Sequence, residues 1–407
     1  MALLTAPSRP ALLQRTRLLG PAFVAAVAYV DPGNVATNTA AGASYRYLLL
    51  WVLVGATLMA GLIQYLSAKV GWLTGESLPS LVGQRTSRRV RLAYWGQAEL
   101  VAVATDIAEI VGGALALQLL FGLPLMLGAV ITAVVSTALL YVQRHGQVSF
   151  ERVIVGLLAI VTVGFLAGLV VAPPDPGAAA AGLVPRLAGT ESALLAVGML
   201  GATVMPHAVY LHSALVRDRH GRATPGNARS VLGSVKADVV LAMLVAGSVN
   251  IGMLLLSGSA LFGLSLDGLP AVHAALGAQL GPAVAICFAL ALLASGLAST
   301  SVGGYAGAVI MDGLLHRRIP LLWRRLATTV PALALLGAGL DPTRLLILSQ
   351  VVLSFGIPFA LVPLVRIASD RRLMALVPTR PATLALTWAV AAVIVALNVV
   401  LVVLLAR

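Results

Sequence analysis

The sequence predicts an all-α polytopic membrane protein built from two inverted sets of helices. Of its 407 residues, 59% are hydrophobic and 10% are charged, whereas a soluble domain carries about 25% charged residues. Eleven apolar runs are each long enough to cross a bilayer, which takes about 20 residues. Two of these runs are interrupted by proline at corresponding positions, which is typical of inverted repeats. These observations predict a membrane protein and argue against an enzyme.

The apolar runs occupy most of the chain, and several connections between them are too short to hold a soluble domain. We therefore expect residues 1–407 to form a single transmembrane domain. The runs lie near residues 18–43, 47–72, 94–120, 122–142, 151–172, 190–215, 230–257, 281–312, 323–340, 344–366 and 382–405.

Basic residues set the expected orientation of these spans. If the N-terminus is cytoplasmic, all but four of the 27 Lys and Arg residues lie on the cytoplasmic side or at helix ends there. Cytoplasmic loops are enriched in Lys and Arg, so we expect this orientation, and an odd number of spans then places the C-terminus outside. The net charge of +13 is thus a topology signal and does not indicate nucleic-acid binding.

The first span contains the interrupted stretch Ala28–Val35, with Asp31 about half a helix deep. A carboxylate at this depth costs about 3 kcal/mol on insertion scales. Pro32 lacks a backbone donor and Gly33 lacks a Cβ, so the helix is expected to break here. Broken helices at membrane depth occur only where they line a cavity or are buried in protein. The stretch therefore predicts a binding site.

The sixth span contains a matching interruption in Gly201–His207. At a single offset of 174 residues, Ala28 corresponds to Ala202, Asp31 to Met205 and Pro32 to Pro206. The two spans are an odd number of crossings apart and so run in opposite directions. This predicts an inverted repeat of five plus five helices, about 18–172 and 190–366, with helices 1 and 6 broken and an eleventh helix at about 382–405.

Brought together, the two breaks would offer a mixed set of ligands to a cation. Asp31 supplies a carboxylate, Asn34 an amide oxygen and Met205 a thioether, and Ala28 and Ala202 have carbonyls freed from helical pairing. Oxygen ligands suit Mg²⁺, Ca²⁺ or Mn²⁺, whereas a thioether favours softer transition metals. The set predicts a site for Mn²⁺ or Fe²⁺ that also admits Cd²⁺ and Co²⁺. Taken singly, Met205 could be a packing residue and Asn34 a helix cap.

The third span contains the carboxylates Glu99, Asp106 and Glu109, of which the last two share one helix face. Carboxylates inside a span need a partner or a proton, and chains of them form proton relays. We expect Asp106 to accept the proton that leaves Asp31 when a metal binds there. The alternative is a charge cluster that only holds helices together.

Histidines and a charged pair follow the second break. His207 begins the second half of helix 6, where a neutral imidazole is favoured. We expect His207 to act in proton transfer or gating, with simple packing as the alternative, and the same two interpretations apply to His212. Lys236 and Asp238, near the start of the seventh span, are expected to form an interfacial pair or a snorkelling anchor.

The motifs Asp31-Pro32-Gly33-Asn34 and Met205-Pro206-His207 together resemble the signature of the Nramp family of proton-coupled divalent metal transporters. The resemblance extends from about Leu19 to the eleventh helix. It implies a LeuT-type fold and import of Mn²⁺ and related metals across the bacterial plasma membrane. It also implies that Asp31, Asn34 and Met205 are side-chain ligands, that Ala28 and Ala202 lend carbonyls, and that Gln350 binds the metal in some conformations.

The resemblance also favours a proton relay across helix 3. It would run from Asp31 through Asp106 and Glu109 toward Arg324 and Arg325 at the start of helix 9. Glu99 lies nearer the cytoplasm and would be the exit or a neutralising partner.

No phosphate-binding loop or nucleotide-binding domain is present in the sequence, so we expect coupling to an ion gradient and no cofactor or nucleotide-binding partner. The expected function is secondary active symport of Mn²⁺, and also Fe²⁺, Cd²⁺ and Co²⁺, with protons through a lipid bilayer. An uncoupled metal uniporter or channel of the same fold is the alternative, since only the helix 3 carboxylates argue against it. An amino-acid transporter is disfavoured because Asp31 would repel a substrate carboxylate.

Overall fold

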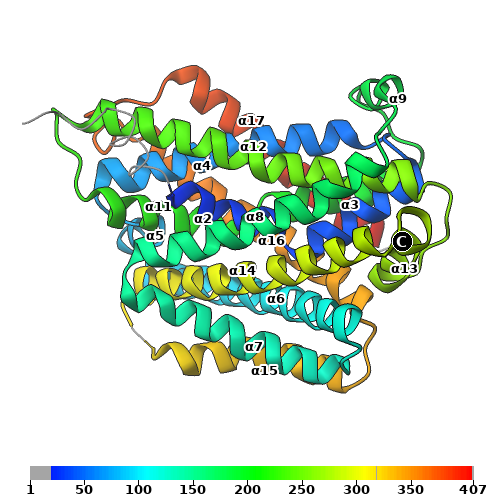
Figure 1. The fold of residues 1–407 in the computed structure, drawn as a ribbon. Coiled ribbons are helices and arrows are strands. Elements are labelled where there is room, and N and C mark those ends of the chain that lie inside the picture. The colour runs from blue at the N-terminus through cyan, green and yellow to red at the C-terminus, as the bar shows by residue number, and fades with distance from the viewer. Residues whose placement is uncertain (1–19, 318, 406–407) are drawn as a thin grey trace, which may run out of the picture.

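The computed structural model describes residues 20–317 and 319–405, which form helices and their connections without any strand. Long helices run side by side, and the short helices α5, α9 and α13 lie at the ends of the bundle (Figure 1). The elements are α2 (Pro21–Val27), η1 (Ala28–Val30), α3 (Pro32–Tyr45), α4 (Leu50–Thr74), α5 (Leu78–Arg85), α6 (Arg88–Phe121), α7 (Leu125–Tyr141), η2 (Val142–His145), α8 (Gln147–Val171), α9 (Pro176–Ala181), α10 (Thr190–Thr203), α11 (Pro206–His220), α12 (Ala228–Ala260), α13 (Gly268–Leu280), α14 (Pro282–Leu315), α15 (Leu321–Gly337), α16 (Pro342–Ser369) and α17 (Pro381–Leu405).

Each of the eleven predicted spans corresponds to a helix or a broken helix. In the part of the chain that the structure describes, eight helical segments are long and apolar enough to cross a membrane, α10 and α11 counting as one. The other three predicted spans are the broken helix formed by α2, η1 and α3, and the shorter helices α7 and α15. The predicted number and order of spans therefore agree with the helices.

Helix 1 breaks at Asp31, as predicted. After the 3₁₀ turn η1, Asp31 is extended (φ −70°, ψ 167°), and Pro32 is the first residue of α3. Carbonyls freed before the break receive side-chain donors from two other helices. Asn250 Nδ2 of α12 donates to the Tyr29 carbonyl (2.7 Å) and Ser295 Oγ of α14 donates to the Val30 carbonyl (2.5 Å). The break is thus satisfied inside protein, as a break at membrane depth must be.

Helix 6 breaks in the same way. The helix α10 ends at Thr203, Met205 is extended (φ −82°, ψ 119°), and Pro206 begins α11. Both breaks therefore place an extended residue directly before a proline, which suits the first turn of a helix because proline has no N–H to leave unpaired.

Helix α6 lies directly against the first break. Gly112 of α6 faces Pro32 so closely that a Cβ at Gly112 would overlap the proline ring. α6 also packs along α14, where Gly296 lies against the backbone of Glu109 and Gly113. Close approach at these glycines holds the carboxylates of α6 beside the break in helix 1.

Asp238 of α12 binds the first turn of α2. Its carboxylate accepts hydrogen bonds from the backbone N–H groups of Gly20 (3.0 Å) and Ala22 (2.9 Å). The carboxylate complements the free N–H groups and the positive end of the helix dipole. The expectation of an interfacial pair between Lys236 and Asp238 was wrong, because Asp238 points inward and is buried while Lys236 is exposed.

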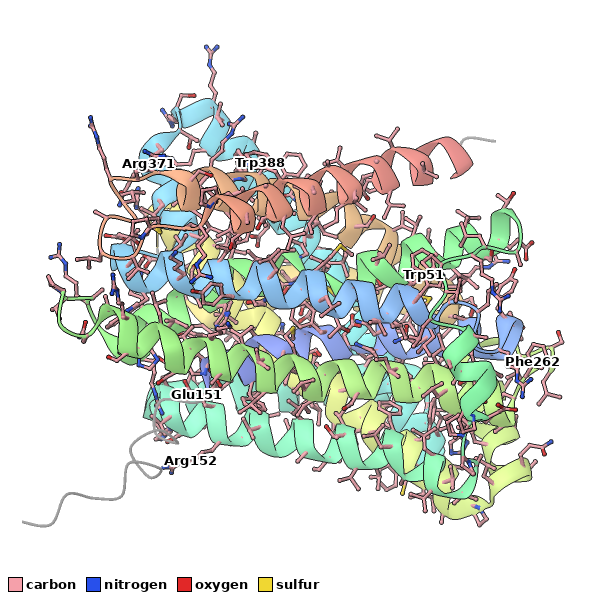
Figure 2. All side chains as sticks on the ribbon, turned by 90° about the horizontal axis from the view of Figure 1, so that it is seen from above. Trp51, Glu151, Arg152, Phe262, Arg371 and Trp388 are labelled. Carbon is pink, nitrogen blue, oxygen red and sulfur yellow. The ribbon has the colours of Figure 1, made fainter. Side chains whose placement is uncertain are left out.

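The two ends of the bundle differ in their side chains. Figure 2 shows Glu151, Arg152 and Arg371 toward one end and Trp51 and Phe262 toward the other. Glu151 is paired with Arg219 at 3.4 Å, close to the start of α2. The short helices α9 and α13 lie at the end marked by Trp51 and Phe262, in the connections from α8 to α10 and from α12 to α14.

Candidate metal site

Asp31 is buried where helix 1 breaks, with 1% of its surface exposed. One carboxylate oxygen accepts hydrogen bonds from the backbone N–H (2.8 Å) and the side-chain Nδ2 (2.7 Å) of Asn34. The other oxygen accepts one from Gln350 Nε2 of α16 (3.1 Å). Asp31 itself caps α3, so the alternative that Asn34 is the cap was wrong. These donors are neutral amides, so they do not neutralise the negative charge of Asp31, which remains available to a cation.

The second break adjoins the first through Asn34. Asn34 Nδ2 also donates to the Ala202 carbonyl near the end of α10 (2.9 Å). Met205 follows three residues later and is fully buried, and Ala28 is buried one helical turn before Asp31. The structure therefore brings Asp31 and Asn34 together with the Ala202 carbonyl, as the two breaks predicted, and with Gln350, as the family resemblance implied.

Two buried oxygens beside Asp31 lack hydrogen-bond partners among the described residues. They are Oδ1 of Asn34 and Oε1 of Gln350, whose amino groups are both directed at Asp31. Buried acceptors without donors are rare in proteins and require an explanation. A cation would satisfy both amide oxygens and the carboxylate, since hard and borderline divalent ions prefer such ligands.

Glycine at position 33 makes room for this arrangement. A Cβ on Gly33 would overlap the Gln350 amide. Across residues 20–317 and 319–405, no group of three or more His, Cys, Asp or Glu side chains could hold a metal ion. A metal site built on Asp31 would instead be of a mixed kind, with one carboxylate and the neutral amide oxygens beside it.

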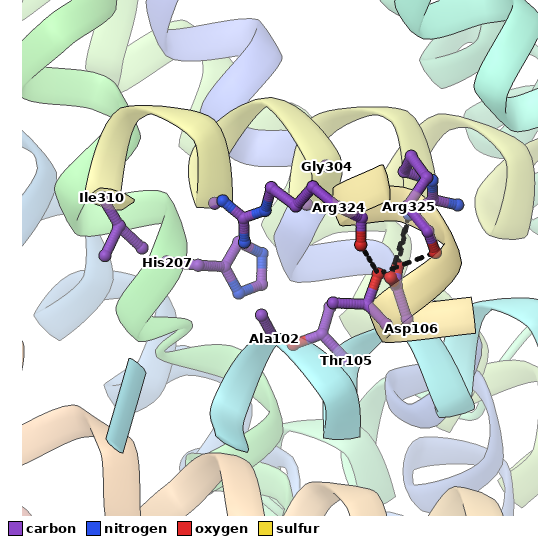
Figure 3. Close-up of a pocket in the computed structure, with 11 residues that line it drawn as sticks. Ala102, Thr105, Asp106, His207, Gly304, Ile310, Arg324 and Arg325 are labelled. Atoms are coloured by element: carbon purple, nitrogen blue, oxygen red, sulfur yellow. Dashed lines mark hydrogen bonds and ion pairs between the residues drawn. The ribbon is translucent and has the colours of Figure 1, made fainter. Parts of the chain in front are cut away.

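A second polar region lies between α6, α11, α14 and α15. It surrounds a cavity of about 10 Å³, which is room for one water molecule. Figure 3 shows Asp106, His207, Arg324 and Arg325 around this cavity. Four of the residues predicted for the proton pathway, which come from three separate helices, therefore line one cavity.

Two ion pairs join α6 to α15 in this region. Arg325 Nη1 contacts both carboxylate oxygens of Asp106 (2.7 and 2.9 Å), and its Nη2 donates to Ser136 Oγ of α7 (3.2 Å). Arg324 Nη2 lies 3.5 Å from Glu99 Oε1. Both arginines are nearly fully buried. Each thus neutralises one carboxylate of α6.

Glu109 differs from the other carboxylates of α6. It is fully buried, and neither of its carboxylate oxygens has a hydrogen-bond partner in the described chain. Thr300 lies nearby, but its hydroxyl donates to the Gly296 carbonyl. Asp31 and Asp106 are both close enough for their charges to act on Glu109. Glu109 therefore lies between the metal site and the ion pairs.

The two histidines of α11 have different surroundings. His207 lines the small cavity, and both of its ring nitrogens are buried without a partner among the described groups. His212 Nδ1 instead contacts Gln64 Oε1 of α4 at 2.6 Å, and the Gln64 amide donates to the Tyr29 hydroxyl. Of the two, only His207 lies beside Asp106.

Residues that the sequence reasoning missed make space for the arginines and for Glu109. Gly303 faces the Glu109 carboxyl, Gly304 faces Arg325, and a Cβ on Gly307 would overlap the Arg324 guanidinium. Glycines are tolerated in membrane helices where neighbouring groups approach closely. The pattern Gly-Gly-x-x-Gly inside an apolar run was the available signal for this slot in α14.

Arg324 also lines a larger cavity near the end of the bundle. This cavity measures about 390 Å³, and its lining includes Arg217, Asp218 and Asp312. Arg324 thus separates the one-water cavity from a wide polar space.

The fold and the buried break site define a multi-pass membrane protein of the LeuT type. The Nramp profile, described as "Natural resistance-associated macrophage protein-like", matches residues 22–404. This chain belongs to the Nramp family. A protein named divalent metal cation transporter MntH, from Mycobacterium tuberculosis, is 55% identical over 402 residues, covering 97% of this chain and 93% of the relative. The protein of the same name from Bacillus subtilis is 45% identical, covering 95% and 91%.

Solved structures agree with this assignment. A manganese transporter from Eremococcus coleocola, in complex with an aromatic bis-isothiourea substituted compound, has a TM-score of 0.87 at 30% identity and covers 98% of this chain and 88% of its own. The nucleobase-cation-symport-1 family transporter MHP1 has a TM-score of 0.57 at 14% identity, covering 95% and 91%. The second likeness shows the shared LeuT-type fold alone. The predicted fold class and family are therefore confirmed.

A side chain at Gly307, in the glycine slot of α14, should lower the stability of the protein. Gly307→Ala displaces the Arg324 guanidinium from Glu99, and such overpacking costs about 1–3 kcal/mol. We expect the unfolding temperature of the purified protein in detergent to fall. The control is Gly156→Ala in α8, where a Cβ meets open space and helix propensity favours alanine, so its unfolding temperature should be unchanged or higher. Equal unfolding temperatures for Gly307→Ala and wild type would contradict the slot.

Proposed function

We propose that this protein is a secondary active carrier that moves divalent transition metals together with protons into the cytoplasm. The observation that carries the proposal is Asp31, buried at two helix breaks beside unpaired oxygens of Asn34 and Gln350. A buried intramembrane carboxylate marks an ion pathway by default. The names of the relatives, a divalent metal cation transporter and a manganese transporter, support the same substrate class.

The metal would bind between the two breaks. Asp31 supplies the charge, and the amides of Asn34 and Gln350 must rotate, because their amino groups now face Asp31 and only their oxygens can bind a cation. The Ala28 and Ala202 carbonyls and the Met205 sulfur complete the proposed ligand set. Rotation of the two neutral amides would turn both of their oxygens toward the Asp31 carboxylate.

The thioether of Met205 sets the proposed preference among metals. A soft ligand disfavours Ca²⁺ and Mg²⁺ and favours Mn²⁺, Fe²⁺, Cd²⁺ and Co²⁺. The single carboxylate is consistent with this preference, because Ca²⁺ sites use six to eight oxygen ligands, often several of them carboxylates.

The proton would leave Asp31 when the metal arrives. Asp106 was the expected acceptor from the sequence, but Arg325 already neutralises it through two contacts. Among the described residues Glu109 forms no ion pair and no hydrogen bond, so its buried carboxylate gains the most by taking up a proton. We therefore assign the first transfer to Glu109, with Asp106, His207 and the one-water cavity next.

The exit would follow the arginines of α15. Arg325 holds Asp106 and Arg324 holds Glu99, and Arg324 also borders the large cavity at the bundle end. The side chain of Arg324 thus lies between the Asp106–Arg325 pair and the large polar cavity. This role agrees with the expectation that Glu99 is a neutralising partner near the cytoplasm.

The proposed location is the plasma membrane of a bacterium, with the N-terminus in the cytoplasm and the C-terminus outside. The basic loops support this orientation, and Arg152 and Arg371 lie toward the opposite end of the bundle from Trp51 and Phe262 (Figure 2). The relatives named above are bacterial proteins.

The principal test is Asp31→Ala. Removing the single charge of the pocket should abolish Mn²⁺ influx into liposomes that carry the purified protein and an internal Mn²⁺-sensitive dye. Asp267→Ala, at an exposed position before α13, is the matched control and should transport normally. Wild-type Mn²⁺ influx through Asp31→Ala would refute the site.

Met205→Ala tests the source of selectivity. Loss of the sulfur should weaken Cd²⁺ and Mn²⁺ binding and let Ca²⁺ compete better, because oxygen ligands alone do not discriminate against it. The measurement is Mn²⁺ influx against a Ca²⁺ titration. Met199→Ala, which removes a fully buried methionine of α10 away from the break, should leave the Ca²⁺ competition curve unchanged. If Met205→Ala also leaves it unchanged, the sulfur does not select the metal.

Coupling is tested with Glu109→Gln and Asp106→Asn. Both substitutions keep the side-chain shape and remove an acceptor, so Mn²⁺ should still bind while Mn²⁺-driven acidification of the liposome lumen falls steeply. Glu191→Gln, at the exposed start of α10, is the control. A lumen that acidifies in the wild type but equally well with Glu109→Gln would remove Glu109 from the relay. A wild-type protein that carries Mn²⁺ without any acidification would instead support the uncoupled uniporter.

A further inference from the structure

Helix α16 carries Gln350 and is interrupted twice by proline. Pro358 and Pro363 both lie inside the helix. Proline has no backbone N–H and its ring crowds the carbonyl four residues earlier, so the helix bends and that carbonyl loses its helical partner. The two carbonyls freed in this way are those of Ser354 and Phe359.

Each freed carbonyl receives a side-chain donor from a different helix. Asn398 Nδ2 of α17 donates to the Ser354 carbonyl at 3.0 Å, and the Tyr210 hydroxyl of α11 donates to the Phe359 carbonyl at 2.9 Å. Both side chains are buried, with exposures of 8% for Asn398 and 2% for Tyr210. The two proline bends of α16 are therefore capped from outside the helix.

The first capped carbonyl lies one helical turn after Gln350. That turn packs against the end of α10, where a Cβ on Gly201 would lie 2.7 Å from Ser354 Cβ and 3.7 Å from the Gln350 carbonyl. The next residue after Gly201 is Ala202, whose carbonyl is bound by Asn34. The turn from Gln350 to Ser354 is thus held between α10 on one side and α17 on the other.

A small cavity lies at this junction. It measures about 10 Å³, and its lining includes Gly201, Ser354 and Asn398. Asn398 Oδ1 is buried without a hydrogen-bond partner in the described chain, so the cavity offers it room for one water. Asn398 is therefore a polar residue set into a contact that is otherwise apolar.

We propose that Asn398 and Tyr210 are positioning residues that fix the bends of α16 and so hold Gln350 against Asp31. Neither side chain touches the candidate metal site, and both act through the backbone of α16. The proposal rests on the proposed function, because it concerns the approach of Gln350 to the metal. It also assigns a task to α17, which lies outside the predicted inverted repeat.

The physical reason is the cost of an uncapped carbonyl. A buried acceptor without a donor costs on the order of tenfold in an equilibrium constant. Without the Asn398 amide, α16 would lower this cost by changing its bend until the Ser354 carbonyl found another donor. Gln350, one turn earlier, would move with the helix away from Asp31.

A double-mutant cycle with the proline tests this mechanism. Asn398→Leu removes the donor and should raise the KM for Mn²⁺ influx by about tenfold. Pro358→Ala restores a backbone N–H that can bond the Ser354 carbonyl, so Asn398→Leu should have no further effect in that background. An equal rise in KM in both backgrounds, or no rise with Asn398→Leu alone, would overturn the proposal.

A second cycle separates positioning from general stability. In a Gln350→Ala background, Asn398→Leu should not raise KM further, because the side chain that it positions is already missing. A merely structural role would lower activity additively and would leave KM unchanged. Thr387→Val on α17, whose hydroxyl bonds only within its own helix, is the control and should match wild type.

Tyr210→Phe with Pro363→Ala provides an independent pair of substitutions. Tyr210→Phe removes only one hydroxyl, so this pair remains usable if Asn398→Leu does not fold. The same non-additivity is expected for the KM and for the unfolding temperature in detergent, and additive effects in this pair would also overturn the proposal. The unfolding measurement separates a failure of the two helix caps from a failure of the proposed transport function. If wild type shows no Mn²⁺ influx, the proposed function fails, while coupling of Asn398 to Pro358 and of Tyr210 to Pro363 in unfolding still decides whether the caps exist.

Discussion

The structure depends on keeping one carboxylate, Asp31, inside a membrane-spanning bundle. A charge in that position must have partners, and here they are the amides of Asn34 and Gln350. To supply them, two helices break in the middle, and a third brings Gln350 over the glycine at position 33. The freed carbonyls then require donors such as Asn250 and Ser295 from the surrounding helices. Most buried polar side chains around the first break follow from this single requirement.

The two buried arginines of α15 divide the buried carboxylates around the site into two sets. Asp106 and Glu99 are each matched with an arginine of α15, and those pairs hold α6 and α15 together. Among the described residues, Glu109 and Asp31 form no ion pair with an arginine, and Glu109 lies close enough to both Asp31 and Asp106 for their charges to act on it. In the proposed relay the paired Asp106 links α6 to α15 and receives the proton second, whereas the unpaired Glu109 receives it first and the unpaired Asp31 meets the cation. The arrangement of arginines therefore assigns different tasks to chemically similar residues.

Much of the fold and the core of the site could be predicted from the sequence. The spans follow from hydropathy, and the two breaks follow from Asp31-Pro32-Gly33 and Met205-Pro206, because proline and glycine act locally. The approach of Gln350 to Asp31, 319 positions apart, was available only through family resemblance. The capping of α2 by Asp238 and the pairing of Asp106 with Arg325 could not be predicted, because they depend on how helices far apart in sequence are rotated. The glycines of α14 were visible in the sequence, but the groups for which they make room were not.

Complete burial of the pocket has a consequence for the hydration of the ion. Asn34 and Met205 have no exposed surface, and Asp31 has almost none. An ion that binds there in this conformation must leave nearly all of its water shell behind. Mg²⁺ is small and loses its waters reluctantly, while larger divalent ions release theirs more readily. Dehydration would therefore discriminate against Mg²⁺ before any ligand of the site touches it, which would add a barrier at entry to the preference proposed for the sulfur of Met205.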